Sequence, residues 1–497
     1  MTDTLAASLL QQAVELHQQG RLEPAQALYR QVLALNPQQF DAQHLLGVIA
    51  RQQGDAVTAI GLISRAIAID SAQANAHCNL GAALLDAGRI EDALASHERA
   101  LALNPAYAMA WSNRGNALRR LGRLDEALLS YQRALEIQPQ YAEAHCNRAI
   151  VLQDLNRYLD ALGAAEAALT IKDRYADAWL ARGRALHCLR YLPEAVESFD
   201  RAIHLRPDWA EAYSAQGASL HKLGEFAASL DSYDQALKHQ PDYALAHYHR
   251  GNALRSLGRR EEAVAAYRAA LAHGDDPETI AFALASVGEG TTPPALPNDY
   301  VRSLFDQYAN HFDQHLTEVL GYQTPAVLDA LLRHVAPASE LNTVDLGCGT
   351  GLCGPYLRAY SRRLDGVDLS QPMLDKAAER QLYDELACAD LLAYLDDRNA
   401  AYDLAVAADV FVYIGDLAPV FRAVHAALRP GGRFCFSVEA GDDADYVLRP
   451  SNRYAHTLEY LQRLAADTGF TVLASQALVA REENGAPIAA HAIIMRK

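Results

Sequence analysis

The chain has 497 residues, of which 51% are hydrophobic and 21% charged, and its formal net charge at pH 7 is −17. This length and apolar content suffice for two hydrophobic cores, and the acidic balance disfavours a nucleic-acid partner, which needs a concentrated basic surface. No apolar run approaches the roughly 18 residues of a membrane span, so we expect a soluble, cytoplasmic protein.

The seven cysteines are dispersed along the chain. They are Cys78, Cys146, Cys188, Cys348, Cys353, Cys388 and Cys435. Because none belongs to a C-x-x-C pair or has a histidine at ligand spacing, the sequence predicts neither a zinc site nor an iron–sulfur cluster. An odd number of dispersed cysteines fits a reducing compartment.

The first half of the chain repeats with a period of 34 residues. Glycine recurs as Gly47, Gly81, Gly115, Gly183, Gly217 and Gly251, and proline as Pro37, Pro105, Pro139, Pro207 and Pro241. Small residues keep the same period from Ala25 to Ala263, where two helices must cross closely. This pattern is similar to the tetratricopeptide repeat, whose unit is a helix, a turn and a second helix.

Eight such units fit between about Ala6 and Pro277. The resemblance implies an α-solenoid over residues 1–277, in which stacked units bury their apolar faces and curve around a concave groove. The repeated glycine, alanine and tyrosine residues are interpreted as packing residues, because their register coincides with the positions where helices cross. A protein or peptide partner is expected in the groove.

Asparagines at matched repeat positions are the candidate groove residues. Asn79, Asn113 and Asn147 share one position, and Asn116 and Asn252 share another. The first three would form an amide ladder that binds an extended peptide, as in the similar repeats of O-linked N-acetylglucosamine transferase and SPINDLY. Alternatively, these amides only hydrogen-bond neighbouring helices. The ladder lapses at Ala181, Ala215 and His249.

Residues 278–299 are expected to connect two domains. Residues 278–286 have a helical pattern and would cap the solenoid, and residues 287–297 are rich in glycine and proline, which predicts a short, stiff linker. A second domain would then cover residues 300–497. Its first helix, expected near residues 300–316, carries Phe305, Tyr308 and Phe312 at helical spacing, and its His311 and His315 are interpreted as exposed.

Seven strands are predicted in the second domain, with helices between the early ones. They are residues 342–346, 364–369, 386–389, 404–408, 433–438, 470–480 and 488–495. This alternation predicts a mostly parallel sheet covered on both faces, and the last two strands would form a hairpin through Gly485.

A glycine-rich loop follows the first of these strands. It reads Asp345-Leu-Gly-Cys-Gly-Thr-Gly351, and Asp368 ends the second strand seventeen residues after Gly351. Such glycines allow a tight turn and a close approach of backbone N–H groups to a ligand, while an acid at the end of the second strand can accept both hydroxyls of a ribose. The sequence therefore predicts a site for a nucleotide-like cofactor.

Two further motifs follow in order, Gly366-Val-Asp-Leu-Ser370 and Leu428-Arg-Pro-Gly-Gly432. Together the three motifs resemble the class I S-adenosylmethionine-dependent methyltransferases over roughly residues 298–497. The resemblance implies a Rossmann-like fold with a seven-stranded sheet, methyltransferase activity and S-adenosylmethionine as cofactor. It also implies a lid, because similar enzymes use an F-D-x-x-A-x-x-F-D segment like that around Tyr308.

The same resemblance assigns cofactor roles to particular residues. Gly347, Gly349 and Gly351 would hold the amino acid part, Asp345 would order the loop, and Asp368, followed by Leu369, would bind the ribose. Met373 would cover the adenine, Asp390 would accept from its exocyclic amine with Leu391 alongside, and Tyr308 would reach the cofactor carboxylate. The alternative role for Asp390 is that of a helix cap.

The methyl acceptor is expected beyond the fourth strand. The segment Asp409-Val-Phe-Val-Tyr413 departs from the N/D-P-P-Y/F of amino-methylating nucleic-acid enzymes, which favours a small-molecule, lipid-like or peptide acceptor. Methyl transfer is a direct displacement, so alignment suffices unless the acceptor is poorly ionised and needs a base. The candidate catalytic residues are Asp409, Tyr413 and His456, with Arg453 and Tyr454 as candidates for binding an anionic acceptor; ordinary surface structure is the alternative for each.

The sequence thus predicts a methyltransferase whose repeats recruit a protein partner or substrate. The alternative is a scaffold in which the repeats act and the second domain only senses cofactor.

Overall fold

A computed structural model describes residues 2–309, 312–314, 316, 322–335, 340–442, 444–449, 451–483 and 486–497. The chain divides into two compact units, Met1–Pro241 and Asp242–Lys497. His311, His315 and Gly485 lie outside the described residues. No helix within these described ranges has the length and apolar content needed to cross a bilayer.

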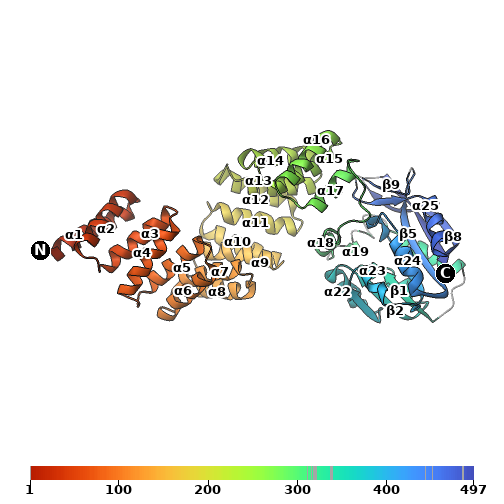
Figure 1. The fold of residues 1–497 in the computed structure, drawn as a ribbon, viewed down its shortest axis with the longest axis horizontal. Helices are drawn as coiled ribbons and strands as arrows, with labels where there is room; N and C mark the ends of the chain where they lie inside the picture. Colours follow the sequence, from red (N-terminus) through yellow and green to blue (C-terminus); the bar gives the residue numbers. More distant parts are fainter. Residues whose placement is uncertain are drawn as a thin grey trace. The chain divides into compact units, whose positions relative to one another are not determined.

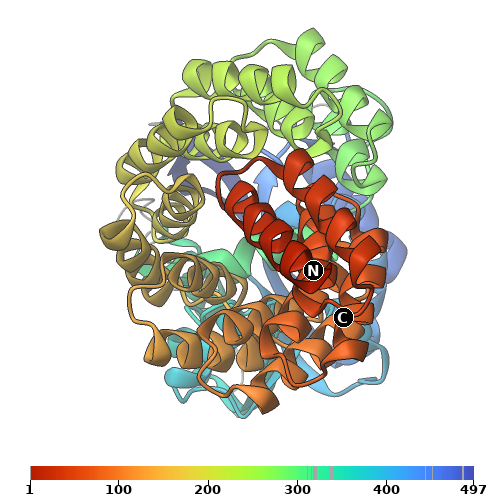
Figure 2. The ribbon, with the colours of Figure 1, turned by 90° about the vertical axis from the view of Figure 1, so that its left-hand side faces the viewer.

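The first unit is an array of helix pairs (Figure 1). Its helices are α1 (Thr2–Gln18), α2 (Leu22–Leu35), α3 (Phe40–Gln52), α4 (Ala56–Ile69), α5 (Ala74–Asp86), α6 (Ile90–Leu103), α7 (Ala108–Arg120), α8 (Leu124–Ile137), α9 (Ala142–Asp154), α10 (Tyr158–Ile171), α11 (Ala176–Cys188), α12 (Leu192–Leu205), α13 (Ala210–Lys222) and α14 (Phe226–His239). Each helix packs on the next one, and the successive pairs of this unit turn progressively when viewed from its N-terminal side (Figure 2).

The repeated glycines lie where two helices of a pair touch. A Cβ atom on Gly115 would lie 2.7 Å from the Tyr131 ring, and one on Gly183 would lie 2.5 Å from the Phe199 ring. Each ring belongs to the second helix of the same unit and is almost fully buried. The glycines are therefore packing residues, as the periodicity predicts.

The second unit begins with three more helices. They are α15 (Ala244–Ser256) and α16 (Arg260–Ala272), which continue the 34-residue period, and α17 (Pro277–Ser286), at the place predicted for a capping helix. The Asp276 carboxylate caps α17 by accepting the N–H of Thr279.

Residues 287–297, predicted as a stiff linker, pack against the loop that follows the fourth strand. The Leu296 N–H donates to the Tyr413 carbonyl at 3.0 Å, and the Pro294 carbonyl accepts the N–H groups of Gly415 and Asp416 at 2.8 Å. The Leu296 side chain is buried beside Phe282 of α17. We call residues 287–297 the strap, because they contact α16 through Gly288 and Glu289 and the α/β part through Pro293, Pro294 and Leu296.

The α/β part contains one sheet within the described residues. Its strands are β1 (Leu341–Leu346), β2 (Ser361–Asp368), β3 (Glu385–Cys388), β4 (Tyr402–Ala407), β5 (Leu428–Ala440), β6 (Tyr446–Leu448), β7 (Tyr454–His456), β8 (Thr471–Glu483) and β9 (Ala486–Arg496). The order is β3-β2-β1-β4-β5-β7-β6, and β9 pairs with β5 and β8 in antiparallel fashion.

The mostly parallel sheet confirms the predicted fold class, with two strands more than predicted. The additional strands, β6 and β7, have three residues each, and β7 pairs with β5 at only two positions. Strands this short show no alternation of polar and apolar residues in the sequence, so the segment after β5 resembles a loop.

The α/β part also contains helices, and two clusters of buried side chains join some of them to the sheet. The helices are α18 (Asn298–Tyr308), α19 (Phe312–Gln314), α20 (Thr324–His334), α21 (Gly354–Arg358), α22 (Gln371–Glu379), α23 (Leu391–Asp396), the 3₁₀ helix η2 (Phe411–Tyr413), α24 (Ala418–Ala427) and α25 (Leu458–Thr468). One cluster joins the sheet to α24 and α25 through Phe421, Phe434 and Phe436, and the other joins it to α20 and α21. The strand order reverses between β1 and β4, which is where parallel sheets of this kind bind ligands.

Candidate active site

The glycine-rich loop connects the carboxyl end of β1 to α21. Gly347, Gly349 and Gly351 have φ angles of 66°, 53° and 81°, a region that residues with a Cβ rarely adopt. A Cβ on Gly347 would lie 2.5 Å from a methyl carbon of Val410, whereas the nearest atom to a Cβ on Gly349 is 3.9 Å away. The loop is therefore packed on the β4 side and open above Gly349.

Asp368 at the end of β2 is bound to this loop. Its two carboxylate oxygens accept the N–H groups of Gly349 and Ser370, each at 2.9 Å. Burial raises the pKa of Asp368, and these backbone donors oppose the rise. The structure thus brings the acid and the glycine loop together, as the sequence predicts for a ribose site.

Asp345 lies beneath the loop and is almost fully buried. The Tyr383 hydroxyl donates to its carboxylate at 2.7 Å. Burial raises the pKa of Asp345 to about 7; the Tyr383 hydrogen bond opposes this rise and the charge of Asp368 adds to it. Asp345 therefore connects the end of β1 to the segment after α22.

Two aspartates connect the aromatic segment of α18 and α19 to the loops. The Ser370 hydroxyl donates to Asp306 at 2.6 Å, and Asp313 accepts from both Thr350 and Arg380. Sequence reasoning did not select these aspartates. Their signal was present, because each one follows a phenylalanine in the F-D-x-x-A-x-x-F-D segment.

The remaining cofactor candidates differ in their surroundings. Tyr308 is half-buried at the end of α18, with its ring 5.6 Å from that of Phe312. Leu369 and Tyr413 both pack against the cluster that includes the strap residue Leu296. Met373 is fully buried in α22.

Asp390 caps helix α23. One of its carboxylate oxygens accepts the N–H groups of Leu392 and Ala393, and the other accepts from the Asn298 amide at 3.2 Å. The helix-cap alternative is thus observed, and the second oxygen faces α18. Leu391 is partly buried next to it.

Asp409 follows β4 with a φ of 55°. The Ser437 hydroxyl donates to its carboxylate at 2.7 Å and accepts the Asp409 N–H at 2.8 Å. Tyr322 and Thr324 also donate to this carboxylate. Burial raises the pKa of Asp409, and the donors, with the nearby Arg453, oppose the rise.

Tyr413 and Arg453 lie together next to Asp409. They are hydrogen-bonded to each other, and the Tyr413 ring lies 5.5 Å from that of Phe305 in α18. Burial raises the pKa of Tyr413, and the Arg453 charge opposes the rise. The structure therefore brings three of the predicted acceptor residues, Asp409, Tyr413 and Arg453, together beside α18, and we call this group the acceptor edge.

A buried glutamate, which sequence reasoning missed, organises Arg453 of this edge and two further arginines. Glu439 at the end of β5 is only 2% exposed. It forms ion pairs with Arg449 at 3.5 Å, with Arg453 at 4.0 Å and with the buried Arg481. Since a buried carboxylate needs compensation, this group fixes the arginines next to the acceptor edge.

His456 and Tyr454, the other predicted residues of this segment, lie in the interior. Both side chains are fully buried. The His456 Nε2 lies 3.0 Å from the Gly415 carbonyl, and burial lowers the pKa of His456 to about 4, against the opposing effect of the Gly415 and Ile414 carbonyls. The Tyr454 hydroxyl donates to the Pro293 carbonyl in the strap at 2.7 Å.

The asparagines of the first unit bond to neighbouring helices. The Asn79 amide lies 2.9 Å from the His44 ring, Asn113 contacts Cys78 at 3.5 Å, and Asn147 donates to Asn116 at 3.1 Å. These contacts agree with the second alternative drawn from the sequence, while each amide keeps further hydrogen-bonding capacity.

Family models match both the repeated helices and the α/β part. A family model described as a methyltransferase domain matches residues 344–434. Models described as tetratricopeptide repeats match residues 10–74, 74–107, 98–128, 146–210 and 214–278, and a TPR repeat model matches residues 115–156. The chain carries tetratricopeptide repeats and a methyltransferase domain.

Curated relatives match this methyltransferase domain. A malonyl-[acyl-carrier protein] O-methyltransferase from Pseudescherichia vulneris is 33% identical over 140 residues, which are 28% of this chain and 53% of the relative. A trans-aconitate 2-methyltransferase from Paracidovorax citrulli is 35% identical over 104 residues, which are 20% of this chain and 40% of the relative. The chain spans about half the length of the first of these relatives.

Among solved structures, a chain of the APC/C hetero-tetramer Cut9–Hcn1 is 18% identical, with a TM-score of 0.47, covering 56% of this chain and 55% of that one. An S-adenosylmethionine dependent methyltransferase from Mesorhizobium loti is 24% identical, with a TM-score of 0.28, covering 34% of this chain and 96% of that one. No group of His, Cys, Asp and Glu suited to a metal ion occurs in the described part of the chain.

Proposed function

We propose that the protein is a cytoplasmic, S-adenosylmethionine-dependent methyltransferase whose repeats, over residues 1–277, recruit a protein or peptide partner to a catalytic domain at residues 300–497. One observation carries the cofactor assignment: three left-handed glycines lie next to Asp368, which accepts the Gly349 N–H at 2.9 Å. The open space above Gly349 is where a ligand can approach the backbone.

The residues present fit this cofactor. Gly347, Gly349 and Gly351 would surround its amino acid part, Asp368 its ribose, and the free lone pairs of Asp390 its adenine amine. Bound S-adenosylmethionine supplies an electrophilic methyl group on a sulfonium. Asp306 and Asp313 connect α18 and α19 to Ser370 and Thr350, and in this proposal Tyr308 of α18 would reach the cofactor carboxylate.

We further propose an oxygen atom of an acidic molecule as the methyl acceptor. The support is Arg453, which Glu439 and Tyr413 hold at the acceptor edge, together with relatives whose names specify malonyl and aconitate acceptors. A carboxylate acceptor is ionised at neutral pH and needs no base. The O–CH₃ bond forms as the S–CH₃ bond breaks, leaving a methyl ester and S-adenosylhomocysteine.

In this reaction, Arg453 would orient the acceptor through a carboxylate that does not react. Tyr413 would position the Arg453 guanidinium, and the Ser437 hydroxyl would hold Asp409 in its left-handed conformation. This proposal gives His456 no role, because its ring is fully buried.

The test is transfer of labelled methyl from S-adenosylmethionine to a malonyl thioester and to trans-aconitate. We expect base-labile incorporation, which identifies an ester, and a loss of about ten-fold or more in kcat/KM for Arg453→Gln with a smaller change in cofactor affinity. Incorporation that resists base would contradict an ester product. Arg362→Gln, on the exposed start of β2, is the matched control.

A further inference from the structure

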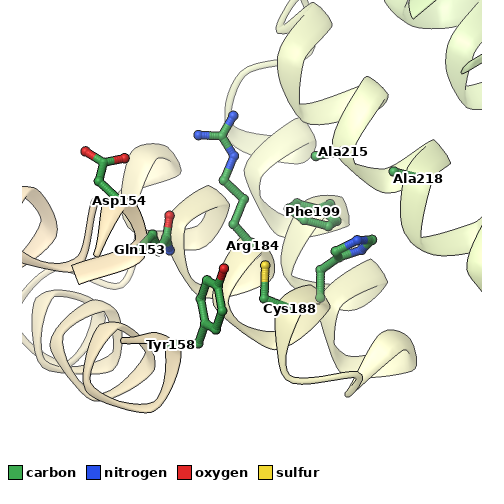
Figure 3. Close-up of a pocket in the computed structure, with 9 residues that line it drawn as sticks. Gln153, Asp154, Tyr158, Arg184, Cys188, Phe199, Ala215 and Ala218 are labelled. Carbon is green, nitrogen blue, oxygen red and sulfur yellow. The ribbon is translucent and has the colours of Figure 1, made fainter. Parts of the chain in front are cut away.

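A cavity of about 330 Å³ opens among helices α9 to α13 of the first unit. Figure 3 shows Tyr158, Arg184 and Cys188 on one side of it and Ala215 and Ala218 on the facing helix α13. The ring of Phe199 forms part of its wall. This volume lies within the range of about 300–1,000 Å³ that is typical of ligand pockets.

Two residues that line the cavity, Ala215 and Ala218, are small residues at repeat positions where other repeats carry asparagine. The position of Asn79, Asn113 and Asn147 is occupied by Ala181 and Ala215 in the later repeats. The position of Asn116 and Asn252 is occupied by Ala218 in α13. The row of amides therefore ends where the apolar cavity begins, on the same helix faces.

Positive charge gathers beside the cavity, although the chain as a whole carries a net charge of −17. Lys222, Arg184 and Arg190 all lie near enough to act on the Cys188 thiol, where they oppose the rise in its pKa that burial causes. Arg184 is paired with Glu211, and the nearby Asp154 is paired with Arg119 at 2.8 Å.

Arg190 and Lys222, unlike Arg184, are not paired with an acidic side chain within the described residues. They are also close enough to each other for their like charges to interact. An anionic group on a ligand would relieve this repulsion.

We propose that this cavity is the anchor site for a protein partner, and that it takes an apolar side chain of an extended acidic segment. The apolar side chain fills the space beside Phe199, Ala215 and Ala218. Flanking Asp or Glu residues of the partner meet Arg190 and Lys222, and the partner's backbone continues along the asparagine row toward Asn147. The inference rests on the proposed recruiting role of the repeats and adds the chemistry of the partner.

The test uses the full chain and short fluorescein-labelled degenerate peptide pools, read by fluorescence anisotropy at low salt. One pool has a fixed Phe flanked by Asp, a second has Phe flanked by Lys, and a third has Gly flanked by Asp. We expect the first pool to bind about ten-fold or more tightly than either of the others, and its affinity to fall as salt rises.

Two sets of variants separate the apolar and the charged parts of the site. Ala218→Phe fills the cavity, and Arg190→Glu with Lys222→Glu reverses the charge; each should reduce binding of the first pool about ten-fold. The controls are Ala227→Phe, and Arg201→Glu with Lys238→Glu, which make the same changes at exposed positions of α12 and α14. These controls should bind like the wild type.

The proposal would be overturned if the three pools bound equally or if variants and controls lost binding equally. It would also be overturned if a free dicarboxylate such as succinate bound in place of the peptides. S-adenosylmethionine is titrated into the same samples. Peptide binding without cofactor binding would contradict the proposed enzyme activity and support the peptide site. Cofactor binding without peptide binding would support the enzyme and contradict the peptide site.

Discussion

His97 occupies the repeat position that holds tyrosine or phenylalanine in five other repeats. Its ring is fully buried over Gly81, and in the described part of the chain neither ring nitrogen has a hydrogen-bond partner. Burial, and to a smaller extent the charge of Arg51, lowers the pKa of His97 to about 4. A buried polar group without a partner costs about 1–3 kcal/mol.

We predict that His97→Phe stabilises α5 and α6. The ordinary pKa of 6.5 lies above the folded value of about 4. The unfolded chain therefore binds more protons between these values, and the wild type loses stability as the pH falls from about 6.5 to 4. The variant should lose less over this interval, by roughly 3 kcal/mol at most.

Hydrogen exchange of the α5 and α6 peptides at several pH values measures this effect. The control is His204→Phe, at an exposed position of α12. A pH dependence that is the same in His97→Phe and in the wild type would show that His97 does not titrate on opening.

Residues that belong to a contiguous motif could be predicted from the sequence. Asp345, Asp368 and the three glycines follow from one strand and one loop, because a local backbone conformation dictates them. Glu439 and Tyr383 were not accessible, because their partners are 10–42 and 38 residues away in the sequence. Nor was the burial of His456, because β6 and β7 have no sequence signal of their own.

At the scale of helices, packing between the two members of each pair sets the local stability. Gly115 touches the Tyr131 ring, whose hydroxyl donates to Asn116 at 2.7 Å. Gly163, in the middle of α10, is exposed and has no atom within 4 Å of the place where a Cβ would lie. A side chain at position 115 would collide with the Tyr131 ring, whereas a side chain at position 163 would meet no neighbouring atom.

The same substitution should therefore act in opposite directions. Gly115→Ala forces the ring of Tyr131 to move and should cost about 1–3 kcal/mol. Gly163→Ala improves helix propensity and should gain about 0.5–1 kcal/mol. Hydrogen exchange of α7 and α8, and of α10, measures the two effects; a loss at both positions would contradict the packing account.

Helix α15 is connected to the turn before β7 of the methyltransferase domain. Arg255 donates to the side chain of Asn452, whose amide in turn donates to the Tyr300 hydroxyl at 3.2 Å. Asn452 has a φ of 60° and forms a turn in which the Arg449 N–H donates to the Arg453 carbonyl at 2.8 Å. Arg255 thus holds the turn that carries Arg449 and Arg453.

We predict that Arg255→Ala loosens this turn without unfolding the sheet. Exchange of amide hydrogens in β6 and β7 should become about ten-fold faster or more, since a hydrogen bond from a charged donor contributes about 1.5–3 kcal/mol. Exchange in β1 and β4 should stay unchanged. Arg302→Ala, which breaks an exposed pair with Asp299, is the control, and equal effects of both variants would contradict a specific role.

At the scale of the whole molecule, the order of repeats and methyltransferase domain was predictable, because a 34-residue period and a strand–loop–strand motif are long-range patterns. Whether the connecting segment is a free linker or packs on the domain was not predictable. Glycine and proline break regular structure in a linker and in a packed strap alike, and only the contacts of Pro294 and Leu296 with the loop after β4 distinguish the two. Residues 287–297 and the last repeat both belong to the compact unit that begins at Asp242.

The most direct test of the central claim is calorimetric titration of S-adenosylmethionine into the full chain. We expect the wild type to bind it, Asp368→Ala to lose that binding, and Asp375→Ala, which removes an exposed carboxylate seven residues further on, to bind normally. Binding that survives Asp368→Ala would contradict the cofactor site described here, and a wild type that binds no cofactor would favour the scaffold function.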